Sequence, residues 1–247
     1  MRKLIVIFTL IIGLMAGTGS FNPVTVSAAS TTASITADAG TPDILVPAVQ
    51  GPTASQRLIT RARASWPWYI TRAAGLVAAT SMILLMLSGI GLITGATFKL
   101  LEPLTAWATH RALGLVFGVS VVIHIVALLF DRFVPFTIAQ ALVPFASNYR
   151  SVTIAGHHLG SLYVAFGIFS LYAILAIIIS SLLWIDKKSH LWKAMHFLSY
   201  LVAIFVFFHV LYLGTDLAHG VFRVLWIIFG TGTAIAILYR LGRAHSV

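Results

Sequence analysis

Five long apolar segments constrain this chain more than any other feature of its sequence. Each is longer than the ~18 apolar residues that mark a candidate membrane span. Backbone groups find no water inside lipid, so spanning segments are helices or parts of closed barrels, and continuous apolar runs favour helices. The sequence therefore predicts an all-α integral membrane protein, a bundle of five core transmembrane helices at about residues 67–94, 104–130, 153–185, 191–213 and 219–240.

The composition agrees with a membrane protein and limits its chemistry. Of the 247 residues, 59% are hydrophobic and 9% are charged, whereas soluble domains carry roughly 25% charged residues. The net charge of +10 comes from Lys and Arg residues scattered over loops and helix ends, which is not the basic stripe of a nucleic-acid-binding protein. The chain has no cysteine, which excludes disulfides and thiolate-bound metals. A metal would therefore be held by His, carboxylate or Met side chains.

The N-terminal part differs in composition from the core. Residues 1–28 have the basic start, apolar run and small-residue end of a secretory signal peptide; an uncleaved anchor helix is the alternative. Residues 29–56 are rich in Thr, Ala, Ser, Pro and Gly, and residues 57–66 are a short basic stretch. We therefore expect a flexible linker at residues 29–66, on the outer side of the membrane.

The orientation follows from this N-terminal segment. From residue 57 to the C-terminus, Lys and Arg residues divide evenly between the two sides, seven on each, so the positive-inside rule is undecided there and the signal sets the direction. We expect a multi-pass protein of the cell (plasma or inner) membrane, with a core domain at residues 67–240 and a cytoplasmic tail at 241–247.

Four histidines lie inside apolar segments, where ionisable groups are costly and usually functional. His110 and His124 are 14 residues apart on the second core segment, so they face nearly the same way on a helix and lie ~21 Å apart along it. His196 and His209 are 13 residues apart on the fourth. One helix separates these two segments, so they run parallel, and His110 should pair with His196 and His124 with His209.

Two imidazoles from facing helices are the usual axial ligands of a b-type haem. The pattern therefore predicts two haems stacked across the membrane, with Phe117 midway between them. Buried histidines bonded to backbone carbonyls are one alternative, and a His-lined metal or proton transporter is another. The 13-residue spacing turns the two rings of an ideal helix ~140° apart, and the sequence alone offers no explanation of how both reach a partner.

Short motifs accompany the histidines: RAAG at 72–75, HRALG at 110–114, PFASNYR at 144–150, SS at 180–181 and LWKAMHFLSY at 191–200. Together with the 14- and 13-residue spacings, they resemble the ferric-reductase-like transmembrane domain over about residues 67–215. That family includes ferric reductases, NADPH oxidases and the haem-binding membrane subunit of the periplasmic methionine sulfoxide reductase system.

The resemblance implies two haems b that pass electrons from the inner haem to the outer one. It implies that Arg72 lies near the outer haem as a partner for a propionate, and that Arg111 and Lys193 serve the inner propionates. The alternative for these three cations is a role as interface anchors.

The sequence also departs from the family. No Gly-rich nucleotide motif follows a strand, so we expect electrons from a separate flavoprotein or from quinol. Oxidases place a histidine where this chain has Leu128, which puts superoxide production in doubt. The expected function is electron transfer to an outer acceptor such as ferric iron, as the haem component of an oxidoreductase. The alternative is a membrane subunit for a periplasmic reductase. A small metal-acceptor site would use outer-side residues, namely His157, His158, His219, Asp216 and Asp131. The alternative is that these are ordinary polar residues at the membrane interface.

Overall fold

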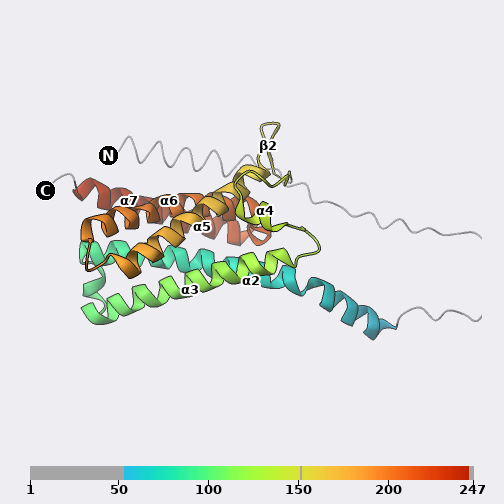
Figure 1. Cartoon of the computed structure of the whole chain (residues 1–247), viewed down its shortest axis with the longest axis horizontal. Coiled ribbons are helices and arrows are strands. Elements are labelled where there is room, and N and C mark those ends of the chain that lie inside the picture. The colour runs from blue at the N-terminus through green and yellow to red at the C-terminus, as the bar shows by residue number, and fades with distance from the viewer. Residues whose placement is uncertain (1–52, 151, 245–247) are drawn as a thin grey trace, which may run out of the picture.

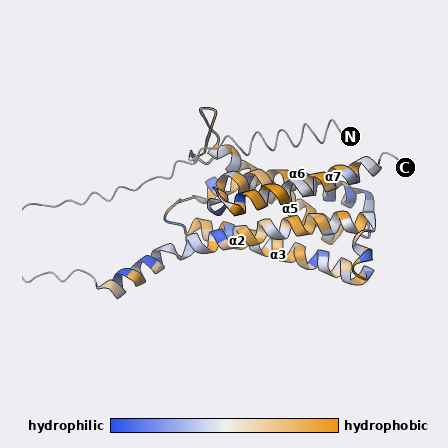
Figure 2. Ribbon diagram, turned by 180° about the vertical axis from the view of Figure 1, so that it is seen from behind, coloured by the Kyte–Doolittle hydropathy of each residue, from blue (hydrophilic) through white to orange (hydrophobic). Residues whose placement is uncertain are grey.

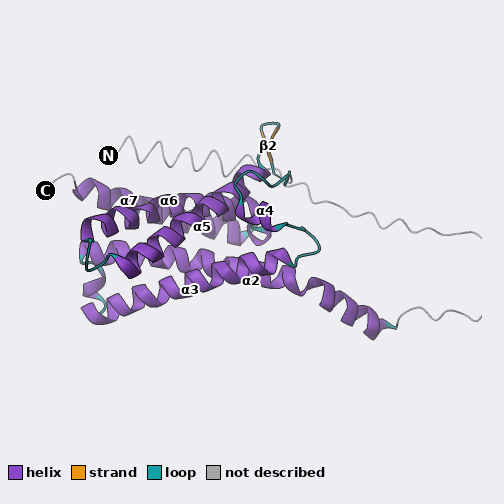
Figure 3. Ribbon diagram, viewed as in Figure 1, coloured by secondary structure: helices purple, strands orange, loops and turns teal. Residues whose placement is uncertain are grey.

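Five helices that are long and apolar enough to cross a membrane form the body of the molecule. A computed structural model describes residues 53–150 and 152–244. It confirms the predicted all-α membrane bundle, which Figure 3 shows as a set of long, roughly aligned helices. The predicted signal or anchor at 1–28 and the linker up to residue 52 lie outside the described residues. The candidate spans are Ser65–Thr94, Pro103–Leu129, Gly160–Leu183, Ser189–Leu213 and Val221–Gly242.

The predicted segments agree closely with helices α3, α6 and α7, whose ends differ from the expected ones by at most four residues. Helix α7 continues through residues 241–244, which were expected in the tail. In chain order the elements are α2 (Ala54–Thr94), η1 (Thr97–Lys99), α3 (Pro103–Leu129), α4 (Ile138–Leu142), β1 (Thr153–Ile154), β2 (His157–His158), α5 (Gly160–Leu183), α6 (Ser189–Leu213), η2 (Thr215–Leu217) and α7 (Val221–Ala244).

Helix α2 begins at Ala54 rather than at residue 67. The Thr53 hydroxyl accepts from the Gln56 amide at 3.3 Å, and the Gln56 side chain accepts from the Thr53 amide at 2.9 Å. This capping box starts a helix, and the Leu, Arg and Ala residues that follow sustain it. The prediction of a flexible linker is therefore wrong for residues 54–66. Residues 54–64, here called the arm, project beyond the other helices (Figure 1) and are more hydrophilic than the bundle (Figure 2).

The third apolar segment does not begin as a helix. Residues 153–158 form a small antiparallel hairpin, in which Thr153 pairs with His158. Ala155 and Gly156 have φ angles of 50° and 80°, as a two-residue turn between strands requires. Helix α5 consequently starts at Gly160, and the predicted start of the third core helix at residue 153 is wrong.

Two pairs of antiparallel neighbours, α2 with α3 and α5 with α6, make the most extensive helix contacts, and α2 also touches α6 and α7. The buried core lies between these helices. Large apolar side chains also face outward; Leu115 and Leu182, for example, are 69% and 78% exposed. Outward apolar residues suit a lipid surround, because acyl chains are as apolar as leucine. Core residues from four helices include Met82, Met86, Phe117, Val202, Phe207 and Trp226.

Candidate functional site

The structure brings the four histidines of the spans together as two pairs. The ring centroids of His110 and His196 are 6.2 Å apart, with the ring planes at 48°. Those of His124 and His209 are 6.4 Å apart, with the planes at 81°. First ring meets first and second meets second, as the parallel course of α3 and α6 predicts. Both rings of α6 reach their partners despite the 13-residue spacing.

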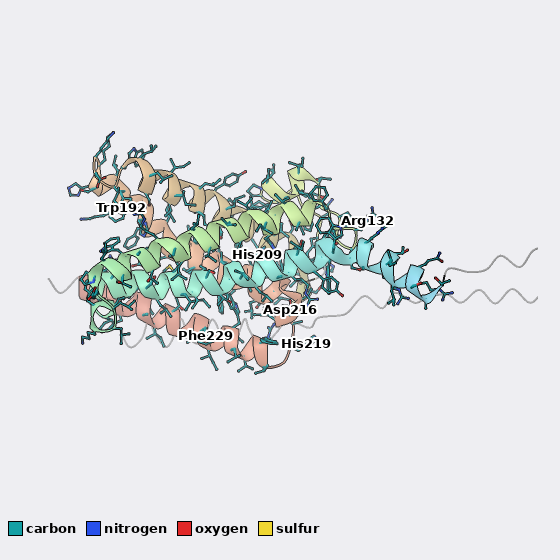
Figure 4. All side chains as sticks on the ribbon, turned by 90° about the horizontal axis from the view of Figure 1, so that it is seen from below. Arg132, Trp192, His209, Asp216, His219 and Phe229 are labelled. Atoms are coloured by element: carbon teal, nitrogen blue, oxygen red, sulfur yellow. The ribbon has the colours of Figure 1, made fainter. Side chains whose placement is uncertain are left out.

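The two pairs lie at different depths in the bundle. Fourteen residues of α3 and thirteen of α6 separate them, which corresponds to ~20 Å along either helix. Figure 4 shows His209 among the helices, with Trp192 toward one end of the molecule and Arg132 toward the other. Asp216 and His219 lie nearer the Arg132 end. The pairs therefore occupy two levels of a bundle that is long enough to span a ~30 Å hydrocarbon core.

Backbone carbonyls fix the protonation of the His124–His209 pair. His124 Nδ1 lies 2.8 Å from the Thr71 carbonyl oxygen, and His209 Nδ1 lies 2.8 Å from that of Tyr163. A carbonyl can only accept, so Nδ1 carries the hydrogen in both rings. In a neutral imidazole this leaves Nε2 as the nitrogen with a free lone pair, which is the form that binds metals.

The His110–His196 pair is held differently. The Ser88 hydroxyl donates to the Leu85 carbonyl at 2.9 Å, so its oxygen accepts from His110 Nδ1, which lies 2.9 Å away. Among the described residues, His196 Nδ1 is buried and has no hydrogen-bond partner. The Trp192 ring packs against His196 with its centroid 5.3 Å away. Only one ring of this pair is therefore fixed by a hydrogen bond.

The distances within each pair suit two axial ligands of one metal ion. Bonds from a metal to imidazole nitrogen are about 2.0–2.1 Å, so an ion centred between two opposed rings separates their centroids by about 6 Å. Residues 53–150 and 152–244 contain no group of three or more His, Asp or Glu arranged for a metal. A planar macrocycle supplies four ligands and requires two from the protein. The residues present fit that requirement at each level.

The other predicted site residues lie near these pairs but differ in exposure. Phe117 is 6% exposed and sits midway between the two histidines of α3, within the core. The Arg72 guanidinium forms an ion pair with Asp216, with Nε 2.9 Å from Oδ2, and lies 4.0 Å above the Trp68 ring centroid. Arg111 is exposed beside His110. Lys193, also predicted for the inner propionates, is exposed as well.

The expected metal-acceptor site is not assembled. Asp216 is bonded to Arg72, and the buried Asp131 accepts from the Phe133 amide at 2.8 Å. His157 and His158 are exposed in strand β2. Within the described part of the chain these residues form no group of three metal ligands, so the hypothesis of a shared acceptor site is wrong.

Sequence reasoning missed the hydrogen-bond acceptors of the histidines. Ser88 is a polar residue in an apolar run, and that was an available signal. The acceptors Thr71 and Tyr163 act through their main-chain carbonyls, which any residue type has. The side chains of Thr71 and Tyr163 themselves therefore give no signal of this role.

Comparisons of the chain with protein-family models, with curated proteins and with solved structures found no match.

Proposed function

We propose that this protein carries electrons across a membrane through two b-type haems, each held by one histidine pair. The observation that supports this most directly is that the histidine rings lie in pairs and that most of them have hydrogen on Nδ1. Rings from α3 and α6 lie 6.2 Å and 6.4 Å apart at two levels, and three of the four hold their Nδ1 hydrogen in a bond. Nε2 is thereby left for iron. Buried histidines that served only as hydrogen-bond donors would have no reason to gather in pairs.

When bound, haem supplies reversible one-electron redox chemistry at iron. The chain's own residues do the remaining work. The Thr71 and Tyr163 carbonyls and the Ser88 hydroxyl orient the imidazoles and raise their basicity as ligands. Phe117, which is buried in the core, lies midway between the two histidines of α3 and would pack between the two haems.

Two arginines are proposed partners for haem carboxylates. Arg111 is exposed next to His110 and would serve the inner haem. Arg72 lies directly after Thr71, whose carbonyl binds His124, so it would serve the outer haem. Its guanidinium already binds Asp216. A haem carboxylate would have to share Arg72 with Asp216 or replace it.

The direction of transfer follows from the proposed topology. With the N-terminal residues outside and the C-terminus in the cytoplasm of a plasma or inner membrane, the His110–His196 level is the inner one. Electrons would enter there from a flavoprotein or quinol and leave at the His124–His209 level for an outer acceptor such as ferric iron. The protein would be the haem component of an oxidoreductase, consistent with its resemblance to the ferric-reductase-like family.

The arm favours a second candidate, a membrane subunit for a periplasmic reductase. Residues 54–64 have three arginines, Arg57, Arg61 and Arg63, and no acidic residue, and their described side chains are exposed. A basic helix that projects from the outer end is suited to contact an acidic surface on a protein acceptor. Retained ferric reduction after deletion of residues 54–64, with loss of transfer to such a reductase, would identify this second function.

The decisive experiment is a reduced-minus-oxidised absorption spectrum of the purified full chain, with chemical quantitation of haem. We expect the spectrum of low-spin haem with two histidine ligands and about two haems per chain. A haem-free protein that conducts ions in vesicles would instead support the transporter and overturn the redox proposal.

A further inference from the structure

Three glycines lie directly against three of the paired histidines. A Cβ atom built on Gly167 would lie 2.6 Å from His209 Cε1. One built on Gly75 would lie 3.0 Å from His124 Nδ1, and one on Gly89 would lie 3.1 Å from His110 Cε1. Ordinary van der Waals contacts of a Cβ atom are 3.4–4 Å. A Cβ atom at Gly167 would therefore force the His209 ring to move, and one at Gly75 or Gly89 would displace the facing ring by a few tenths of an ångström.

The same glycines uncover the carbonyls to which the histidines are bonded. In an α-helix the side chain of residue i+4 leans back toward the N-terminus and covers the carbonyl of residue i. Gly75 is four residues after Thr71, and Gly167 is four residues after Tyr163. With hydrogen in place of a side chain, each carbonyl can accept from an imidazole as well as from its own helix.

The third glycine, Gly89, also uncovers a carbonyl, but that carbonyl reaches its histidine through a serine hydroxyl. Gly89 is four residues after Leu85, whose carbonyl accepts from the Ser88 hydroxyl. Ser88 in turn accepts from His110 Nδ1. The hydroxyl thus bridges the Leu85 carbonyl and the His110 ring. The arrangement at Gly89 differs from that at Gly75 by this one additional hydrogen bond.

The fourth histidine provides an internal comparison. Thirteen residues after Gly167, the interval that separates His196 from His209, helix α5 has Ser180 instead of glycine. The Ser180 hydroxyl bonds to the Ile177 carbonyl at 3.0 Å. His196 Nδ1 is the one ring nitrogen among the four Nδ1 atoms that has no partner in the described residues. The hydrogen bond and the glycine are present together at three histidines and absent together at the fourth.

The spacing of the glycines matches that of the histidines. Gly75 and Gly89 are 14 residues apart on α2, and His110 and His124 are 14 residues apart on α3. Because α2 and α3 are antiparallel neighbours, equal intervals bring each glycine opposite one histidine. Helix α2 thus presents one glycine to a histidine of α3 at each of the two levels of the site.

We infer that Gly75, Gly89 and Gly167 are positioning residues for the proposed haem ligands. Each provides the space for an imidazole ring. Gly75 and Gly167 also expose the carbonyls that keep hydrogen on Nδ1 of His124 and His209. At Gly89 the exposed Leu85 carbonyl binds the Ser88 hydroxyl, which keeps hydrogen on Nδ1 of His110, so that Nε2 is available to iron in all three rings. The inference rests on the proposed function for its reference to haem. The contacts on which it is built belong to the chain alone. It assigns Gly75 and Gly167 to one centre and Gly89 to the other.

The test replaces each glycine by alanine in the full-length protein. Gly75→Ala and Gly167→Ala should lose or shift the low-spin ferric resonance signal of the His124–His209 centre and leave the other signal unchanged. Gly89→Ala should do the reverse. The retained centre reports that the variant is folded. The matched control is Gly232→Ala, because a Cβ at Gly232 meets no atom within 4 Å. Three glycine variants with wild-type haem content and wild-type signals would overturn the inference.

A double variant covers the case in which Gly167→Ala fails to fold. If the damage comes from contact with the ring, Gly167→Ala should cost almost no stability in a His209→Ala background, as measured by thermal unfolding in detergent. An equal loss of stability in both backgrounds would mean that Gly167 packs against something else, and would overturn its assignment. A wild-type protein without haem would overturn the proposed function, whereas the coupling of Gly167 to His209 can still be measured in that protein.

Discussion

The four imidazoles differ at the residue scale in how their Nδ1 atoms are bonded. His124 and His209 donate to main-chain carbonyls, His110 donates to a serine hydroxyl, and the Nδ1 of His196 has no partner among the described residues. A stronger acceptor makes an imidazole a more basic ligand. The two levels of the site are therefore chemically distinct, although each is built from one histidine of α3 and one histidine of α6.

Single histidine replacements should remove haem one centre at a time. His110→Ala or His196→Ala should leave about one haem per chain, with the signal of the His124–His209 centre intact. The reason is that a haem with two histidine ligands needs both rings of its pair. His124→Ala and His209→Ala should leave the other signal. Haem quantitation with electron paramagnetic resonance measures this. The control is His190→Ala, since His190 is exposed at the start of α6. Two haems in every variant would contradict the assignment.

Ser88 should tune one centre only. Ser88→Ala removes the acceptor of His110 Nδ1, which makes the ring less basic and should raise the reduction potential of the His110–His196 centre. The potential of the His124–His209 centre should not move. A spectroscopic redox titration resolves the two. Ser88→Thr keeps a hydroxyl and should restore the wild-type potential; failure of threonine to do so would indicate a packing effect instead.

The elements owe their positions to a few contacts between distant parts of the chain. Helix α2 is central because it lies along α3 and also touches α6 and α7. The Arg72–Asp216 ion pair joins α2 to η2, the turn between α6 and α7, and the Trp226 indole donates to the Phe207 carbonyl at 3.2 Å between α7 and α6. The first link holds the turn between α6 and α7 against α2, and the second holds α7 against α6, the helix that contains His196 and His209.

The Arg72–Asp216 pair should behave as one unit in stability. Arg72→Gln and Asp216→Asn should each lower the thermal midpoint in detergent, and the double variant should be little worse than either, with a coupling on the order of 1 kcal/mol. Circular dichroism of the four proteins measures it. Arg61→Gln in the exposed arm serves as the control for loss of a cation. Additive losses in the double variant would show that the two residues act separately.

The whole molecule places its two histidine levels in series. They lie ~20 Å apart along the helices, which is a large part of the ~30 Å thickness of the hydrocarbon core. One level by itself therefore does not reach both sides of the membrane. The outward face of the bundle is apolar along the spans, and the hydrophilic arm extends past one end (Figure 2). The proposed electron path from one side of the membrane to the other therefore needs both levels.

Electron passage through vesicles should fail when either level is lost. With ferricyanide enclosed and dithionite added outside, wild-type proteoliposomes should bleach ferricyanide, because dithionite is oxidised and ferricyanide is reduced across the membrane. His110→Ala and His124→Ala should both abolish this bleaching, although each keeps the haem of its intact pair. Transfer at the wild-type rate in either variant would refute a serial path. Protein-free vesicles give the background rate.

Much of the fold was predictable because membrane spans are defined by local composition. The length of an apolar run fixes whether it can cross lipid, and helices α3, α6 and α7 begin and end close to the predicted residues. The early start of α2 and the hairpin before α5 were missed. The start of α2 depends on Thr53, which caps the helix, and the hairpin depends on the positive φ angles of Ala155 and Gly156. These local effects are weak compared with the signal from a long apolar run.

By itself, the sequence determined the helical class, the spans and the relative depths of the histidines, because the rise along a helix depends only on residue number. Tertiary structure decided which atoms hold the rings. The bonds from His124 to Thr71 and from His209 to Tyr163 join residues 53 and 46 positions apart. They depend on how each helix is rotated against its neighbour, and rotation is set by packing of the whole bundle, which no local pattern of residues specifies.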